Sequence, residues 1–104
     1  MIMMRQGDVC LVRCRKPSKS TLGQPQELEH GRIVLTHGEA TGHAHAIEGL
    51  AELYGPESAT RHLHMLKGGR LLHEEHAPLE IPPGWWKVLR QREYADGYIR
   101  RVAD

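Results

Sequence analysis

The sequence predicts an all-β domain, built as a small antiparallel barrel or sandwich of about the size of an SH3-like domain. Several short segments alternate apolar and polar residues, which is typical of half-buried strands. Glycine and proline turns separate these segments, and no stretch sustains the 3.6-residue apolar period of an amphipathic helix. At 104 residues, the chain is expected to form one domain, 1–104.

The first half of the chain predicts a series of strands around one polar loop. Alternation predicts a strand over 7–14, and the Lys-, Ser-, Gly- and Pro-rich stretch near 15–30 predicts a mobile loop. A second strand is expected over 31–36. A third is expected over 43–47, with 52–54 either continuing it or starting another.

The paired glycines of Lys67-Gly68-Gly69-Arg70 predict a two-residue hairpin turn of the primed type. In that register His64 would face His73, and His62 would face Glu75 on the same side of the ribbon. This pairing would bring a second group of histidines together.

Near the C-terminal end, a type II turn over 81–85, with Pro83 and Gly84 at its centre, is expected to lead into a long strand over 86–94. A second hairpin turn is expected over 95–98. Trp85 and Trp86 would point to opposite faces of the strand, which predicts one core tryptophan and one exposed tryptophan.

The charge balance and the cysteines exclude several classes of protein. The formal net charge of +1 argues against a strongly basic nucleic-acid clamp or an acidic tail. No apolar run approaches the roughly 18 residues of a membrane span, so we expect a soluble, cytoplasmic protein. Cys10 and Cys14 would lie about 13 Å apart along a strand, too far for a disulfide. They are expected to be buried thiols.

Histidine is the unusual residue of this sequence. Six of the eight histidines fall between positions 43 and 76, as two His-x-His pairs and one His-x-x-His pair. Residues two apart on a strand share a face, so His43 and His45 could converge on one ion. His73 and His76 would share a side if their stretch forms a turn. If the stretch is extended, His73 would share a side with Glu75 instead.

These patterns predict an open site for a divalent metal, Zn²⁺, Fe²⁺ or Ni²⁺. The candidate ligands are His43, His45, His73 and His76, with Glu75, Glu48 and His64 as further candidates. The simpler alternative is that His43 and His45 are strand histidines bonded to the backbone, that the His62 and His64 pair belongs to a solvated face, and that the carboxylates are ordinary surface groups.

The run Gly38-Glu39-Ala40-Thr41-Gly42-His43-Ala44-His45-Ala46-Ile47-Glu48-Gly49 resembles the first cupin motif, and Pro82-Pro83-Gly84 resembles the Pro-x-Gly turn of the second. The resemblance implies a metal held by three histidines and a glutamate inside a small β-barrel. This sequence lacks a histidine after Gly84, where the third cupin ligand would lie. It is more similar to small uncharacterised bacterial proteins that share GEATGHxH, then HEEH, then RQREY, and this similarity implies no particular reaction.

Two classes of function therefore follow from the sequence. The first is a metal-binding β-protein, cupin-like in character and a candidate enzyme acting on a small molecule. The alternative is a non-enzymatic module that binds RNA or protein, based on an exposed tryptophan and on Arg90, Arg92, Arg100 and Arg101. A metal-free enzyme using His43 or His76 for proton transfer stays open. A homodimer formed through an exposed strand edge is also considered.

Overall fold

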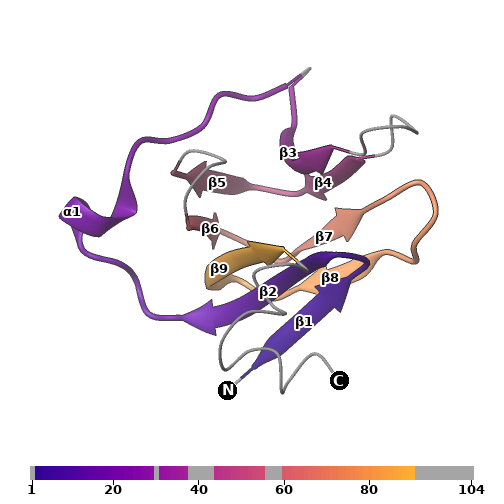
Figure 1. Cartoon of the computed structure of the whole chain (residues 1–104), viewed down its shortest axis with the longest axis horizontal. Coiled ribbons are helices and arrows are strands. Elements are labelled where there is room, and N and C mark those ends of the chain that lie inside the picture. Colours follow the sequence, from indigo (N-terminus) through magenta and orange to yellow (C-terminus); the bar gives the residue numbers. More distant parts are fainter. Residues whose placement is uncertain (1, 30, 38–43, 56–59, 91–104) are drawn as a thin grey trace.

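Two antiparallel sheets pack face to face in the computed structural model, which describes residues 2–29, 31–37, 44–55 and 60–90 (Figure 1). The larger sheet contains, in spatial order, β1 (Met3–Gln6), β2 (Val9–Cys14), β9 (Gly84–Arg90), β6 (Arg61–Met65) and β5 (Ala51–Tyr54). The smaller sheet contains β3 (Ile33–His37), β4 (Ala44–Glu48), β7 (Gly69–Leu72) and β8 (Leu79–Ile81). The predicted all-β architecture is confirmed, as a sandwich.

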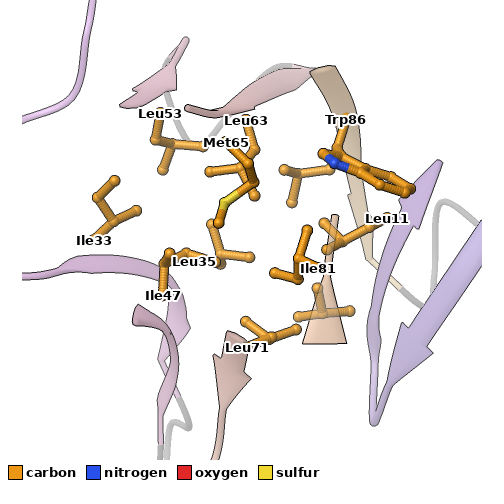
Figure 2. Close-up of a cluster of buried hydrophobic side chains, with 12 residues drawn as sticks. Leu11, Ile33, Leu35, Ile47, Leu53, Leu63, Met65, Leu71, Ile81 and Trp86 are labelled. Carbon is orange, nitrogen blue, oxygen red and sulfur yellow. The ribbon is translucent and has the colours of Figure 1, made fainter. Parts of the chain in front are cut away.

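The core lies between the two sheets and draws side chains from both (Figure 2). Leu11, Leu63 and Trp86 of the larger sheet meet Leu71 and Ile81 of the smaller sheet, and all five are 1% exposed or less. Burying one such side chain contributes about 1.5–3 kcal/mol, so this shared layer holds the sheets together. The core also fixes which side of each strand faces inward.

The two tryptophans of β9 point to opposite faces, as alternation predicts. Trp86 is fully buried and its indole N–H donates to the Pro82 carbonyl at 3.1 Å. Trp85 is half-buried on the outer face of the larger sheet. Pro82 and Pro83 connect β8 to β9, where the turn was expected, and Gly84 has a φ of +129°.

The hairpin predicted at Gly68-Gly69 is wrong. β6 pairs with β5 and β9 in the larger sheet, whereas β7 pairs with β4 and β8 in the smaller one. A primed turn needs positive φ at its first central residue, and neither Gly68 nor Gly69 has a positive φ. Gly69 instead allows close packing, because a Cβ there would lie 2.4 Å from the carbonyl oxygen of Glu48. The two glycines therefore lie where the chain crosses from β6 in the larger sheet to β7 in the smaller sheet.

The segment near 15–30 contains more structure than the predicted loop. Ser18 caps a short helix, α1 (Lys19–Leu22), by accepting a hydrogen bond from the Thr21 backbone N–H. Beyond the helix, the Gln26 N–H donates to the Leu53 carbonyl at 2.7 Å, which attaches the segment to β5. The mobility of this segment stays a prediction.

Most of the other strands predicted from the sequence lie in the described residues and can be compared with the structure. The strands expected over 7–14, 31–36 and 43–47 correspond to β2, β3 and β4, while 52–54 belongs to a separate strand in the other sheet. Sequence analysis missed β1. The strand expected over 86–94 is seen to Arg90, and the turn over 95–98 lies outside the described residues.

Cys10 is buried and Cys14 is half-buried, and no disulfide joins them to each other or to another described residue. Burial raises the pKa of the Cys14 thiol, against the opposing charges of Lys87 and Arg13. Among the described residues, no helix has the length and apolar character needed to cross a bilayer.

Candidate functional site

Three imidazoles gather where β4 approaches the turn that follows β7. The ring of His45 lies 4.3 Å from that of His73 and 6.0 Å from that of His76, measured between centroids. The rings of His73 and His76 are 4.7 Å apart. The stretch 73–76 thus forms the turn that lets its two histidines share a side. His43, the fourth predicted ligand, lies outside the described residues.

His45 faces the inside of the sandwich. It stands on the same side of β4 as the core residue Ile47, two positions along the strand. A register shift in β3 between Val34 and Thr36 places Thr36 opposite His45. Only 4% of His45 is exposed, so a buried imidazole with two polar nitrogens must find partners inside the protein.

Gln6 supplies one of these partners and fixes the tautomer of His45. The Gln6 amide nitrogen donates to the carbonyls of Leu71 and Ala77, each at 2.8 Å. Its amide oxygen, which can only accept, therefore faces His45 Nδ1, 2.8 Å away. Nδ1 must carry the proton of this bond, which leaves Nε2 with a lone pair when the imidazole is neutral.

The Nε2 atom of His45 points at the carboxylate of Asp8, with Nε2 and Oδ1 3.2 Å apart. Burial lowers the pKa of His45, and the charges of His73 and His76 add to that lowering, while Asp8 opposes it. The imidazole is therefore neutral at neutral pH. Two acceptor atoms then face each other, an arrangement that is favourable only when a proton or a cation lies between them.

Gly7 allows the turn between β1 and β2 to approach the histidines. Its φ is +58°, in the left-handed region. A Cβ at this position would lie 2.8 Å from His76 Nε2 and 3.2 Å from His45 Cε1. Only glycine both adopts this backbone conformation without strain and leaves room for the two rings.

Backbone contacts hold the turn at 73–76. The Glu74 carboxylate accepts a hydrogen bond from the Ala44 N–H at 2.8 Å, which ties the turn to β4. The Glu75 N–H donates to His73 Nδ1 at 3.0 Å. His73 is half-buried, while Glu75 and His76 are exposed on the solvent side. The fixed imidazole of His45 thus lies beneath two imidazoles with more access to solvent.

Two of the further candidate ligands are engaged elsewhere. The Glu48 carboxylate accepts from Arg70 Nε at 2.7 Å and from a terminal guanidinium nitrogen at 2.6 Å. His64 stacks on Trp85, with ring centroids 4.2 Å apart and an angle of 2° between the planes, on the outer face of the larger sheet. The predicted pairing of His64 with His73 is therefore wrong, because His64 lies in β6 of the larger sheet and His73 follows β7 of the smaller sheet.

His62 also stays apart from the His45 cluster, the name we use for His45, His73, His76 and Asp8. It is 6% exposed, and its Nδ1 is buried without a hydrogen-bond partner. Burial, followed by the charge of Lys87, lowers its pKa. Among the described residues, no three His, Cys, Asp or Glu side chains already stand as a set that could hold a metal ion.

Sequence reasoning missed Gln6 and Asp8. Both side chains contact His45, which lies 39 positions after Gln6 and 37 positions after Asp8 along the chain. The one local signal was the Gly7-Asp8 pair, which is typical of a tight turn between strands. Of the four arginines behind the RNA-binding alternative, only Arg90 lies in the described part of the chain.

The chain was compared with known protein families, curated proteins and solved structures. No curated protein matched the chain, and no solved structure matched it. One family profile matched residues 5–91, a span that contains all four members of the His45 cluster and Gln6. The description of that family names no fold or activity, so the match gives no support to the cupin resemblance. The chain belongs to the family described as a domain of unknown function (DUF8820).

Proposed function

We propose that this protein binds a divalent metal ion at the His45 cluster. The observation that carries the proposal is the contact between His45 Nε2 and the Asp8 carboxylate. Gln6 directs the lone pair of Nε2 towards Asp8, and the lowered pKa of His45 removes the proton that would otherwise join them. A metal cation between the two atoms would turn an unfavourable contact into two coordinate bonds.

The spacing of these two atoms suits shared coordination. Zinc bonds to imidazole nitrogen and carboxylate oxygen are about 2.0–2.2 Å long, so two ligands of a tetrahedral ion lie about 3.3–3.6 Å apart. His45 Nε2 and Asp8 Oδ1 are 3.2 Å apart. The pair could bind one ion with little movement of either side chain.

In this proposal Gln6 does not bind the metal but holds the ligand His45 in position. Metal-binding histidines usually donate their second N–H to a carbonyl or carboxylate, which fixes the ring orientation and the tautomer. The hydrogen bond from His45 Nδ1 to Gln6 is of this kind. Because Gln6 is itself held by two backbone carbonyls, it keeps Nε2 oriented before any ion arrives.

Completing the site requires movement on the solvent side. His73 or His76 must rotate so that a ring nitrogen reaches the ion, and the turn that carries them is largely exposed. His73 would use Nε2, since its Nδ1 already accepts the Glu75 N–H. His43, which the sequence predicts as a ligand, is the alternative to these two histidines as the third protein ligand.

This donor set suits Zn²⁺, Fe²⁺ or Ni²⁺. Two imidazoles and one carboxylate match the facial triad of non-haem iron sites, and imidazole nitrogen also suits zinc and nickel. Three protein ligands leave a tetrahedral ion with one open position, which is the feature of catalytic metal sites. We propose that a small molecule binds at that position, and that any enzymatic activity would use it.

Calorimetric titration of protein purified without a histidine tag and stripped of metal tests the proposal. We expect one Zn²⁺, Fe²⁺ or Ni²⁺ per chain and at least tenfold weaker binding for His45→Ala, in line with the loss of a first ligand. His62→Ala is the matched control, since it removes an equally buried strand histidine outside the cluster. Absence of saturable binding for all three ions, or equal weakening by both substitutions, would contradict the proposal.

A further inference from the structure

A pocket opens between the two sheets where β3 contacts β5. Its volume is about 410 Å³, within the usual range for small-molecule sites. It lies where β4 ends and β5 begins, which Figure 1 shows above the middle of the molecule. Its apolar lining consists of Leu28, Ile33, Ile47, Leu50 and Ala51.

Exposed apolar side chains gather at this pocket. Leu28 and Leu50 both line it, although they are 59% and 61% exposed. Leu66, 51% exposed, adjoins Leu50, because its backbone N–H donates to the Leu50 carbonyl at 2.9 Å. Ile2 is the one other large hydrophobic side chain that is exposed among the described residues. Such grouping of exposed apolar surface marks a binding site more often than chance.

The charged groups of the pocket leave one positive charge uncompensated. Glu48 lines the pocket, but Arg70 neutralises its carboxylate through two short hydrogen bonds. Arg32 also lines the pocket; its backbone pairs with that of Glu29, and no hydrogen bond or ion pair joins its guanidinium to another side chain in the described part of the chain. A guanidinium beside an apolar cavity is complementary to a ligand with a carboxylate head and an aliphatic body.

We propose that this pocket binds an aliphatic carboxylate, with its hydrocarbon chain against the leucine and isoleucine side chains and its carboxylate on Arg32. The volume equals that of roughly 14 water molecules at about 30 Å³ each, enough for an acid of eight carbons. A second copy of this chain would cover the same leucines, but it would leave an enclosed hollow and an unmatched guanidinium. This site is independent of the His45 cluster.

Titration of ¹⁵N-labelled protein with octanoate, followed by amide chemical shifts, tests the proposal. We expect saturable shifts at Gly31, Ile33, Leu50 and Ala51. 1-Octanol, which has the same chain without the charge, should bind about threefold more weakly or worse, as an exposed ion pair contributes modestly. Arg32→Gln should remove the difference between the two ligands, and Arg15→Gln, which removes an equally exposed guanidinium elsewhere, should preserve it.

Three results would overturn the proposal. One is the absence of saturable shifts at these amides up to the solubility limit of octanoate. Another is an octanoate preference that survives Arg32→Gln. The third is a dimer in sedimentation, with shifts of the same amides that follow protein concentration instead of octanoate concentration. That last result would assign the surface to a second copy of the chain.

Discussion

The chain contains two His-x-His pairs that look alike in sequence and have different surroundings in the fold. In the first pair, His45 is 4% exposed and lies within ring contact of His73 and His76. In the second pair, His62 is 6% exposed with an unpartnered Nδ1, and His64 stacks on Trp85. His45 and His62 are therefore almost equally buried, but the ring nitrogens of His45 face Gln6 and Asp8, whereas Nδ1 of His62 has no hydrogen-bond partner.

The difference follows from which face of the strand each pair occupies. His45 shares the side of the core residue Ile47, so it points between the sheets towards Gln6 and Asp8. The second pair alternates with Leu63 and Met65, which belong to the core, so it points outward. A His-x-His pattern shows that two rings share a face, and the neighbouring strands decide what that face meets.

The largest effect that we expect comes from Gln6→Leu. The substitution leaves His45 Nδ1 and the carbonyls of Leu71 and Ala77 without their partner. At about 1–3 kcal/mol for each buried group left unsatisfied, the free energy of unfolding should fall by about 3 kcal/mol or more. Urea denaturation measures this loss.

Gln26→Leu is the matched control for that substitution, because Gln26 bonds through its side chain to a single carbonyl, that of Gly55, in a partly buried place. We expect it to cost about 1 kcal/mol. Metal affinity should also fall by about 10–100-fold in Gln6→Leu alone. Equal losses of stability for the two variants would show that Gln6 does not organise the cluster.

Gly7→Ala should have the next largest effect. It introduces a strained left-handed residue and places a Cβ 2.8 Å from His76 Nε2. Gly31→Ala introduces similar strain at a φ of +80°, with nothing within 4 Å of the added Cβ. We expect thermal unfolding to show a loss of about 2 kcal/mol for the first and about 1 kcal/mol for the second.

Metal affinity separates these two variants. Only Gly7→Ala should weaken binding, since only its Cβ meets the histidines. If Gly31→Ala weakened the affinity to the same extent, the turn between β1 and β2 would have no special relation to the cluster.

His62→Phe should have a smaller effect, of the opposite sign. The substitution removes a buried nitrogen that lacks a partner and keeps an aromatic ring of similar shape, so we expect a gain of about 1 kcal/mol. His45→Phe should instead destabilise the protein, because it leaves the Gln6 oxygen unsatisfied. Parallel urea denaturation of the two variants measures both signs, and a loss in both would mean that His62 has a partner in solution.

The pH dependence of stability should be the smallest effect. Burial lowers the pKa of His45 and of His62 below 6.5 in the folded state. Below that pH the unfolded chain binds more protons than the folded chain, so stability present above pH 6.5 is lost as the pH falls. Tm measured between pH 7.5 and pH 5.5 should decrease, and less steeply in His62→Phe. A Tm that rises on acidification would contradict the lowered pKa values.

Sequence patterns predicted the local features of this fold and missed those that depend on distant contacts. The two-residue period identified β2, β3 and β4, because each strand buries one face or both. The same reasoning made Gly68 and Gly69 a turn, although tight packing against Glu48 is what requires Gly69. The assignment of β6 and β7 to different sheets was not visible in the local sequence.

The candidate site divides in the same way. Histidine spacing predicted that His73 and His76 could share a side, and the structure brings both rings to His45. The role of these residues as ligands stays a prediction. Gln6 and Asp8 could not be found from spacing, since β1 was not predicted and both side chains meet His45 only through contacts between distant parts of the chain.

The ¹⁵N resonances of the imidazole nitrogens test the central claim most directly. At pH 7.5 without metal, His45 should show a protonated Nδ1 and an unprotonated Nε2. Addition of Zn²⁺ should move the Nε2 signal of His45 and leave those of His62 and His64 in place. A proton on Nε2 of His45, or a Nε2 signal that Zn²⁺ does not move, would contradict the account.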